Sequence, residues 1–324
     1  MATMKDVAKL AGVSIITVSR VINSPQLVKE STRQKVKRVM EETGFIPNQT
    51  AKALVSNQTR TIHIMIPESH DISDPFIMTL VSGVASQLSK EYYSFLIRRD
   101  WEFPYRCDGV IIMGLNLGQE QEIKQKLPHT PCVLFGQTEA ELDWVDIDNR
   151  KGGYLATKHL IEQGHREIGF LKIDEPKRFP IDRYQGYLDA LTEAGIPLDE
   201  SLVCTVKNSE EDGFQKSLAF IEQRRMTAIF ASNDATALGV LRAARKCNRK
   251  VPEELSVVGF DGLFLDQIAD PRLTTIHQPI FEVGEHLAAQ MVRRIELPDH
   301  ELLQRLVEPK LVERETVQKK NVGQ

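Results

Sequence analysis

Between residues 61 and 290, short apolar runs alternate with longer stretches of helical periodicity. Eight runs are candidate strands, at residues 62–66, 94–97, 109–113, 132–135, 168–171, 202–206, 228–230 and 256–259. Helical patterns fill most of the intervals, at residues 76–90, 151–163, 183–194, 213–223 and 235–246. Strands that lead into helices predict parallel, doubly wound α/β sheets, with ligands at the carboxyl ends of the strands. Eight or more strands over a stretch of this length fit two sheets better than one.

The first 60 residues, called the head, carry a charge opposite to that of the rest. They contain ten Lys and Arg against four Asp and Glu, a net formal charge of +6. Because the whole chain of 324 residues has a net charge of −4, the remainder carries −10. A basic segment joined to an acidic body predicts a polyanionic partner for the head alone. A merely solvated basic surface is the alternative.

Two helices joined by a tight turn are predicted at the start of the head. Thr3 and Asp6 form a capping box, and Gly12 ends the first helix. Ser14 then caps a second helix, which ends at the Asn-Ser-Pro sequence of residues 23–25. Two helices with a short glycine-containing turn between them are typical of the helix-turn-helix unit.

A third helix of the head is predicted from a second capping box. Ser31 and Gln34 form the box, and Gly44 follows the last turn. The three helices could also form a small bundle that binds nothing. Isoleucines left outside the packing and a basic face argue against that alternative.

Several side chains of the second helix are not needed for its packing on the first. Val18, Val21 and Ile22 form the apolar stripe, and the side chains left over lie toward the end that enters the major groove in this motif. Arg20 can bond guanine O6 and N7, whereas Ile16 can only contact thymine methyls or shape packing. Hydroxyl side chains there suit phosphates. The candidate DNA contacts of the head are Thr3, Ser14, Ile15, Ile16, Thr17, Ser19, Arg20 and Asn23.

The sequence TMKDVAKLAGVSIITVSRVIN, followed by TRQKVKRVMEETGFIPNQTAKAL, resembles the N-terminus of LacI/GalR-family transcription regulators. The resemblance runs through residues 2–60. It implies that residues 49–56 form a hinge helix on DNA and that Leu54 enters the minor groove at the operator centre, with Asn48 and Ala51 as neighbouring contacts. Simple packing in a linker is the alternative for Leu54.

The body resembles the periplasmic-binding-protein-like core of the same family. The expected fold is an all-α, lambda-repressor-like helix-turn-helix domain followed by an α/β core of two doubly wound parallel-sheet lobes that face each other across a cleft. The expected limits are 1–46 for the helix-turn-helix domain, 47–60 for the hinge and 61–324 for the core, with lobes at about 61–160 and 161–290 and a C-terminal segment at 291–324. The chain is expected to cross between the two lobes several times.

The same resemblance implies effector contacts where strands end. They are Asp74, Phe76, Arg183, Asn208, Asn233, Asp234 and Asp261. Asn233 and Asp234 lie in the family signature ASNDATALG, although Asp234 could instead cap the following helix and Arg183 could bridge the lobes. Asn208 stands where the family often has an aromatic residue, so any stacking on the ligand is left to Phe76.

The interval between residues 97 and 109 is shorter than the family usually has. It predicts that the N-terminal lobe lacks one covering helix and that Trp101, Phe103 and Tyr105 fill the space. An aromatic partner surface is the alternative.

Catalysis is not expected, because the chain has no nucleotide-binding glycine loop, zinc-protease motif or nucleophile elbow. No cofactor and no metal site are predicted, since the histidines lack metal-ligand spacing and the four cysteines include no CxxC pair. The sequence MATMKDVAKL lacks the apolar core of a signal peptide, which predicts a cytoplasmic protein without a membrane partner.

Two functions of different classes fit these features. The first is a nucleoid-associated DNA-binding repressor, a homodimer on a pseudo-palindromic double-stranded operator, controlled by a small-molecule effector that we expect to be a sugar or sugar derivative. A purine-type corepressor is an alternative effector. The second function is a periplasmic-type solute-binding protein, which would need export and would not need a basic head.

Overall fold

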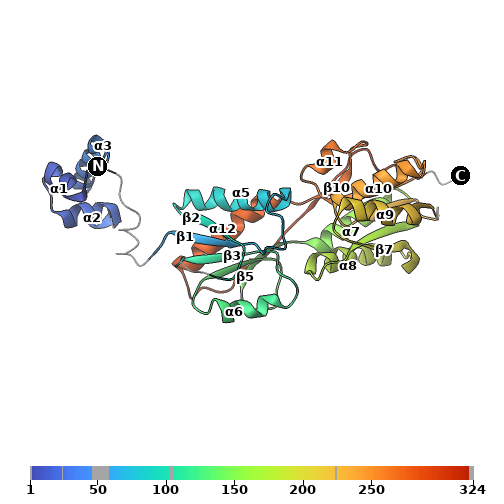
Figure 1. The fold of residues 1–324 in the computed structure, drawn as a ribbon, viewed down its shortest axis with the longest axis horizontal. Helices are drawn as coiled ribbons and strands as arrows, with labels where there is room; N and C mark the ends of the chain where they lie inside the picture. Colours follow the sequence, from blue (N-terminus) through green and yellow to red (C-terminus); the bar gives the residue numbers. More distant parts are fainter. Residues whose placement is uncertain (1, 24, 46–57, 103–105, 223–224, 321–324) are drawn as a thin grey trace. The chain divides into compact units, whose positions relative to one another are not determined.

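The computed structural model describes residues 2–23, 25–45, 58–102, 106–222 and 225–320. The chain forms two compact units (Figure 1). The first spans Met1–Arg60 and Tyr105–Asp108 and contains the head. The second spans Thr61–Pro104 and Gly109–Gln324 and is called the core.

The head is a bundle of three helices around a valine-rich centre. They are α1 (Met4–Ala11), α2 (Ile15–Asn23) and α3 (Glu30–Thr43), with the 3-10 turn η1 (Pro25–Leu27) before α3. Val7, Val18 and Val36, one from each helix, are fully buried. Each helix therefore needs the other two to bury its apolar stripe.

The predicted ends of α1 and α2 are confirmed. Thr3 Oγ1 accepts from the Asp6 N–H, and the Asp6 carboxylate accepts from the Thr3 N–H at 2.9 Å. Gly12 ends α1 with a φ of 60°, which glycine adopts without strain. Ser14 Oγ accepts from the Thr17 N–H at 3.1 Å and so caps α2.

The predicted capping box of α3 is wrong. The helix begins at Glu30, so Ser31 already lies inside the first turn and cannot cap it. Lys29 is the N-cap residue and makes no side-chain cap bond. Gln34 Nε2 instead donates to Glu30 Oε1 at 3.1 Å, while Gly44 ends the helix as predicted.

The N-terminal lobe of the core is built on a six-stranded, all-parallel sheet of order β11-β5-β4-β3-β1-β2. Its strands are β1 (Thr61–Met65), β2 (Ser94–Arg98), β3 (Gly109–Ile112), β4 (Cys132–Phe135), β5 (Asp143–Ile147) and β11 (Gln304–Val307). The helices α5 (Pro75–Lys90) and α12 (Ile280–Glu296) pack on each other and on this sheet, and η2 (Gln119–Glu122) and α6 (Ile123–Lys126) lie between β3 and β4.

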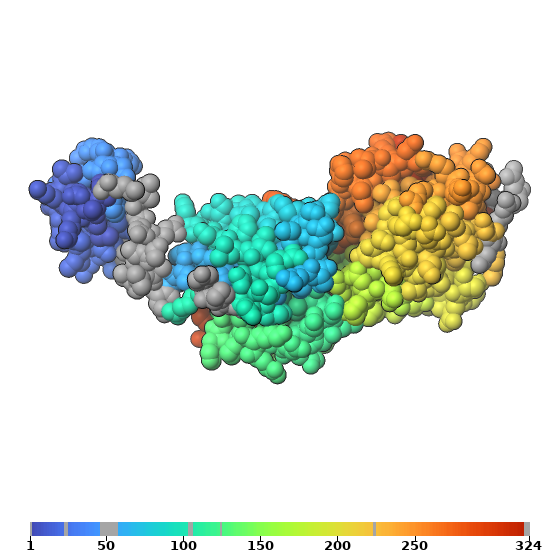
Figure 2. All heavy atoms as spheres, viewed as in Figure 1, coloured from blue at the N-terminus to red at the C-terminus, as the bar shows by residue number. Residues whose placement is uncertain are grey.

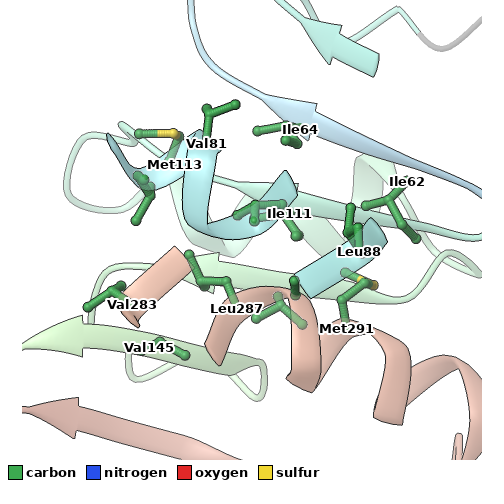
Figure 3. Close-up of a cluster of buried hydrophobic side chains, with 14 of the residues drawn as sticks. Ile62, Ile64, Val81, Leu88, Ile111, Met113, Val145, Val283, Leu287 and Met291 are labelled. Carbon is green, nitrogen blue, oxygen red and sulfur yellow. The ribbon is translucent and has the colours of Figure 1, made fainter. Parts of the chain in front are cut away.

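The core of this lobe joins residues from distant parts of the chain. Ile64 and Ile111 from the sheet meet Leu88 of α5 and Leu287 of α12 (Figure 3). The backbones of α5 and α12 approach so closely that a Cβ on Gly83 would lie 2.0 Å from the Phe281 carbonyl oxygen. Glycine at that position is what permits the contact.

The C-terminal lobe contains a second six-stranded sheet, of order β12-β10-β9-β8-β6-β7. Its strands are β6 (Ile168–Ile173), β7 (Val203–Val206), β8 (Ala228–Ala231), β9 (Ser256–Asp261), β10 (Thr274–His277) and β12 (Lys310–Val312). All pair in parallel except β12, which is antiparallel to β10. Its helices are α7 (Asn149–Glu162), α8 (Arg178–Glu193), η3 (Glu200–Leu202), α9 (Glu210–Glu222), α10 (Asp234–Lys246) and α11 (Leu265–Ile268).

The expected fold class is confirmed, but the expected lobe limits of 61–160 and 161–290 need correction at two helices. α7 packs on α8 and the second sheet, and α12 packs on α5 and the first. The reason is that the chain passes between the lobes after β5, after β10 and after β11, so neither lobe is one continuous segment.

The connection between β2 and β3 contains no helix in its described residues, 99–102 and 106–108, as predicted. The Trp101 ring is partly buried there and lies 4.7 Å from Lys126 Nζ. Phe103 and Tyr105 lie outside the described residues. Among the described helices, none is both long and apolar enough to span a bilayer.

Candidate functional site

The outer face of α2 combines apolar and basic groups. Ile15 and Ile16 are 44% and 65% exposed, whereas Val18 is fully buried. Arg20 is exposed on the same helix. Exposed isoleucines next to an arginine suit a duplex groove, where methyl groups and guanine edges are both available.

The other predicted DNA contacts of the head differ in exposure and in the hydrogen bonds that they make within the head. Thr3 and Ser14 are exposed, but each hydroxyl already takes part in a cap, and Ser14 Oγ also lies 2.9 Å from Thr17 Oγ1. Ser19 is partly buried on α2. The predicted contacts whose side chains lie outside the described residues are Asn23, Asn48, Ala51 and Leu54.

An anchor that the sequence did not suggest holds the chain at the end of the expected hinge segment, 47–60. Asp108 Oδ1 accepts from the Thr59 N–H at 2.7 Å and from the Thr59 hydroxyl at 2.9 Å. Asp108 Oδ2 accepts from the Arg60 N–H at 2.9 Å. A single carboxylate thereby fixes the backbone of these two residues.

A cavity of about 390 Å³ lies between the two lobes of the core. Figure 2 shows the lobes as separate masses that meet at this cleft. The strand ends of both sheets supply its walls, as expected for doubly wound sheets. All seven predicted effector residues line it, namely Asp74, Phe76, Arg183, Asn208, Asn233, Asp234 and Asp261.

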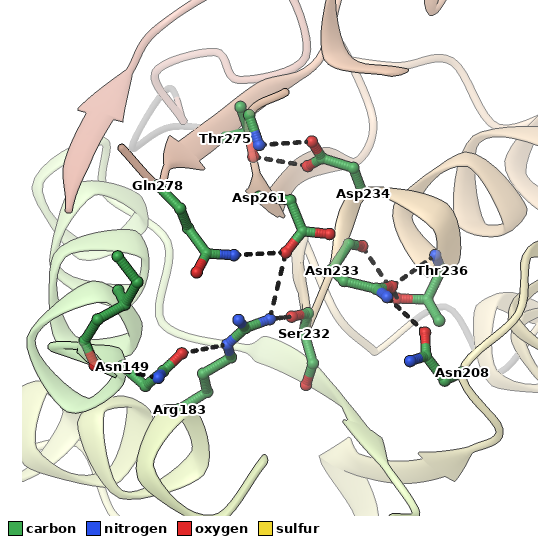
Figure 4. Close-up of polar contacts among 12 residues, drawn as sticks. Asn149, Arg183, Asn208, Ser232, Asn233, Asp234, Thr236, Asp261, Thr275 and Gln278 are labelled. Atoms are coloured by element: carbon green, nitrogen blue, oxygen red, sulfur yellow. Dashed lines mark hydrogen bonds and ion pairs between the residues drawn. The ribbon is translucent and has the colours of Figure 1, made fainter. Parts of the chain in front are cut away.

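Arg183 is the central cation of the cleft (Figure 4). Its side chain is only 5% exposed, and its guanidinium lies 3.6 Å from the centre of the Phe260 ring. Nε donates to Asn149 Oδ1 at 2.9 Å, and Nη1 donates to the Ser232 carbonyl oxygen at 2.6 Å. Burial lowers the pKa of Arg183 to about 10, against the opposing effect of Asp261. The side chain thus stays charged and is held in one orientation.

Asp261 faces this arginine from the end of β9. Its Oδ1 lies 3.6 Å from Arg183 Nη1 and accepts from Gln278 Nε2 at 2.7 Å. Its φ of 126° is unusual for a residue other than glycine, and such strain collects at functional sites. Burial raises the pKa of Asp261 to about 6, although Arg183 opposes the shift.

Asp146, a second carboxylate of the cleft, was not predicted. Its two oxygens accept from the N–H groups of Gln137, at 3.0 Å, and Ile147, at 2.7 Å. Burial nevertheless raises the pKa of Asp146 to about 6. The residue escaped prediction because β5, which contains it, was not recognised as a strand.

Asn233 and Asp234 have different structural roles. Asn233 Oδ1 accepts from the Thr236 N–H at 2.9 Å, so Asn233 caps α10, the role that the sequence analysis considered for Asp234. Both carboxylate oxygens of Asp234 are bonded within the lobe, to the Gly262 N–H and the Thr275 hydroxyl. Asp234 therefore ties α10 to the loop after β9 and to β10.

The apolar walls of the cleft come from phenylalanines of both lobes. Phe76 follows Asp74, which caps α5 by accepting from the Phe76 N–H at 2.8 Å. The Phe76 ring lies 5.7 Å from the Phe135 ring, centre to centre. Phe179 and Phe264 line the cavity from the other lobe. The cleft therefore has aromatic walls, although Asn208 stands at the position where the family often has an aromatic residue.

In the described part of the chain, no three His, Cys, Asp or Glu side chains are placed to hold a metal ion. The polar groups that line the cleft are instead carboxylates, amides, the guanidinium groups of Arg178 and Arg183, the Lys177 ammonium and the His70 imidazole. Together with aromatic faces, such groups orient small organic ligands that carry hydroxyl or amide groups.

Comparison with known proteins agrees with this architecture. A model of the bacterial regulatory proteins of the lacI family matches residues 3–48, and a model of the periplasmic binding protein-like domain matches residues 157–317. The uncharacterized HTH-type transcriptional regulator YvdE of Bacillus subtilis (strain 168) is 36% identical, over 98% of this chain and 99% of that protein.

The chain belongs to the LacI family.

Other LacI-family proteins show the same correspondence over nearly their whole length. The HTH-type transcriptional repressor PurR of Vibrio atlanticus (strain LGP32) is 34% identical over 99% of this chain and 100% of that protein. A complex of the transcriptional regulator CelR with cellobiose has a TM-score of 0.74 and 31% identity, covering 98% of this chain and 100% of that one. The lac repressor dimer bound to operator and the anti-inducer ONPF has a TM-score of 0.80 and 25% identity, covering 98% and 99%.

Membership of the LacI family confirms the resemblance predicted from the head. The protein is a DNA-binding transcriptional regulator, and its relatives are regulators rather than enzymes. The family match over residues 3–48 also sets aside the solute-binding protein as the alternative function.

Proposed function

We propose that this LacI-family regulator is a repressor that binds a pseudo-palindromic operator as a homodimer, and that a sugar or sugar derivative in the cleft controls its affinity for DNA. The observation that carries the proposal is the pair formed by the buried Arg183 and the partly exposed Asp261, which faces a cavity of about 390 Å³. A charged pair of this kind, in a cleft that is also lined by amides and aromatic rings, is suited to hydroxyl groups, which both donate and accept hydrogen bonds. The protein acts in the cytoplasm, on the nucleoid.

Two kinds of effector are candidates for the cleft. The cellobiose complex of CelR supports a sugar, as do the carboxylates of Asp146 and Asp261, since hydroxyls can donate to both. A purine corepressor, the alternative that the family resemblance left open, is the second candidate. Phe76 and Phe135 provide ring surface for either ligand.

Control of DNA binding follows from closure of the cleft. A ligand that bridges Arg183 and the N-terminal lobe favours one arrangement of the lobes over another. We propose that this arrangement orders or melts a hinge helix at residues 49–56, where Leu54 enters the minor groove beside Asn48 and Ala51. Effector and operator then alter each other's affinity by the same factor.

The test uses the full-length protein and sheared genomic DNA. Selection of bound fragments is expected to enrich one pseudo-palindromic sequence. A thermal-shift screen of cellobiose, ribose, several sugar phosphates and hypoxanthine is expected to find a ligand that also changes the Kd for that sequence. Equal binding to all fragments, with and without the compounds, contradicts the proposal.

The recognition role of α2 predicts a selective defect. Arg20→Ala is expected to weaken binding to the selected operator by about 10- to 100-fold, because a bidentate arginine–guanine contact contributes about 1–3 kcal/mol of discrimination. Binding to random DNA should fall far less. Fluorescence anisotropy with both DNAs measures the two effects at one salt concentration.

Arg38→Ala is the matched control, since it removes the same side chain from α3, where Arg38 is 70% exposed. Any loss of affinity in that variant should be the same for the operator and for random DNA. If Arg20→Ala also loses the same affinity for the operator as for random DNA, Arg20 does not read bases.

The two cleft carboxylates predict that effector affinity depends on pH. Because burial raises the pKa of Asp146 and of Asp261 to about 6, most of each is protonated at pH 5. Ligand hydroxyls that donate to an ionised carboxylate should therefore bind about tenfold more weakly at pH 5 than at pH 7.5 for each carboxylate they use. Calorimetric titration with the ligand from the screen, repeated across this range, measures the change. A flat profile shows that neither carboxylate needs to be ionised.

A further inference from the structure

A loop of the C-terminal lobe reaches across the cleft to the N-terminal lobe. Lys177, in the loop between β6 and α8, places its Nζ 2.8 Å from Nε2 of His70, in the loop after β1. The neighbouring Pro176 carbonyl oxygen accepts from the Leu117 N–H at 2.8 Å, and Leu117 follows β3. Two adjacent residues of one lobe thus bond to two loops of the other.

The receiving histidine is held firmly. Arg99 donates to the His70 carbonyl oxygen at 2.5 Å and to the Glu68 carbonyl oxygen at 3.0 Å, which fixes the loop after β1. The ring lies so close to Gly114 that a Cβ there would be 2.7 Å from it. Burial and the Lys177 ammonium both lower the pKa of His70, so its ring is neutral at pH 7 and Nε2 can accept.

Lys177 is also connected to the effector wall of its own lobe. Its Nζ lies 2.9 Å from Glu175 Oε2, and both side chains are about one-fifth exposed. Glu175 Oε1 accepts from Asn208 Nδ2 at 2.8 Å. Figure 4 shows the next bond, in which Asn208 Oδ1 accepts from Asn233 Nδ2 at 2.6 Å. A continuous polar chain therefore runs from Asn233 at the start of α10 to His70 in the other lobe.

We propose that Lys177 is a positioning residue, a clasp that holds the cleft closed through His70 and that responds to a ligand at Asn208. The inference rests on the proposed function, because it takes the cleft to be the effector site. A ligand that accepts the Asn208 Nδ2 hydrogen now bonded to Glu175 competes with Glu175 for it. Since Glu175 also holds Lys177, ligand binding and closure are energetically coupled.

The amide of Leu117 reports on the clasp, because its acceptor belongs to the other lobe. Hydrogen exchange is measured on the full-length protein without DNA or ligand. In Lys177→Met, protection of the Leu117 amide is expected to fall about tenfold, the effect of losing a hydrogen bond from a charged group. Protection of Ile64 in β1 and Phe170 in β6 should not change, since both are buried within single lobes.

Three further variants separate a clasp from an ordinary ion pair. Lys216→Met, on an exposed face of α9, should leave the protection of the Leu117 amide as it is in the parent protein. Lys177→Arg should restore most of the protection because it keeps a charged donor. Asn208→Ala should lower protection at Leu117 by about threefold, although it leaves Lys177 and His70 in place, because it removes the two hydrogen bonds through which Asn208 links Glu175 to Asn233.

Protection of Leu117 within twofold of the parent in Lys177→Met overturns the proposal and leaves Lys177 a solvated partner of Glu175. Unchanged protection in Asn208→Ala overturns the link to the effector wall. Neither outcome depends on finding a ligand, so failure of the clasp can be told apart from failure of the effector screen.

Discussion

Replacing Asp261 by asparagine is expected to abolish the effector response while the protein remains folded and bound to its operator. Asparagine has the same shape, and its Oδ1 can still accept from Gln278 Nε2. The negative charge that faces Arg183 is lost, and breaking a buried charged pair at a ligand site costs enough to weaken binding by at least about 100-fold. The Kd for the ligand from the screen and the operator affinity with and without it measure the two effects.

The control for this prediction is Asp299→Asn, which makes the same chemical change on the exposed loop after α12. It should respond to the ligand as the parent protein does. The prediction fails if the ligand changes the operator affinity of Asp261→Asn as fully as that of the parent protein, at the same ligand concentration. That result rejects Asp261 as an effector contact.

Removing Arg294 is expected to cause the largest loss of stability. Its guanidinium donates to both oxygens of Asp143, at 2.6 and 2.8 Å, and Asp143 is 1% exposed. The Leu303 N–H donates to the same carboxylate at 2.7 Å, so the pair joins α12, β5 and the segment that leads into β11. Arg294→Met leaves a buried charge without its partner and should lower the free energy of unfolding by about 3–5 kcal/mol. Urea denaturation followed by circular dichroism measures the change.

The chain offers a matched control for burial. Arg272 also donates through two nitrogens to one carboxylate, that of Glu315, but the side chains of this pair are 60% and 48% exposed. Arg272→Met should cost no more than about 1 kcal/mol, since water screens exposed pairs. If the two variants lose the same free energy of unfolding, burial does not explain how much the Arg294–Asp143 pair stabilises the protein.

Local signals in the sequence were sufficient for much of the fold. The caps of α1 and α2 depend on residues three positions apart, and they occur where the sequence placed them. The continuous apolar runs of β3 and β8 are typical of strands buried on both faces. For α3, a Ser–Gln spacing matched a capping box, yet Glu30 extends the helix by one residue and makes Ser31 an interior position.

Long-range partners account for what the sequence could not show. β5 reads as polar because of Asp143 and Asp146, whereas both are buried in the structure. Asp143 is compensated by Arg294, which lies 151 residues further along the chain. No local pattern could reveal that partner, so the strand was missed and Asp146 was missed with it.

The candidate site also contains residues that the sequence predicted and a contact that it could not reveal. Asn233 follows β8, Asp261 ends β9 and Arg183 lies on α8, and all three line the cleft as the sequence predicted. The contact between Lys177 and His70 joins residues 107 positions apart and exists only because two lobes face each other. Periodicity and motif spacing carry no information about such a pair.

The interleaved path of the core also has a consequence for synthesis on the ribosome. α12 supplies Leu287 to the centre of the N-terminal lobe, and β11 completes its sheet. That lobe therefore cannot finish folding until residue 307 has been translated, although its first strand begins at Thr61. The C-terminal lobe likewise waits for β12, so both lobes reach completion almost together, long after the helices of the head have emerged from the exit tunnel.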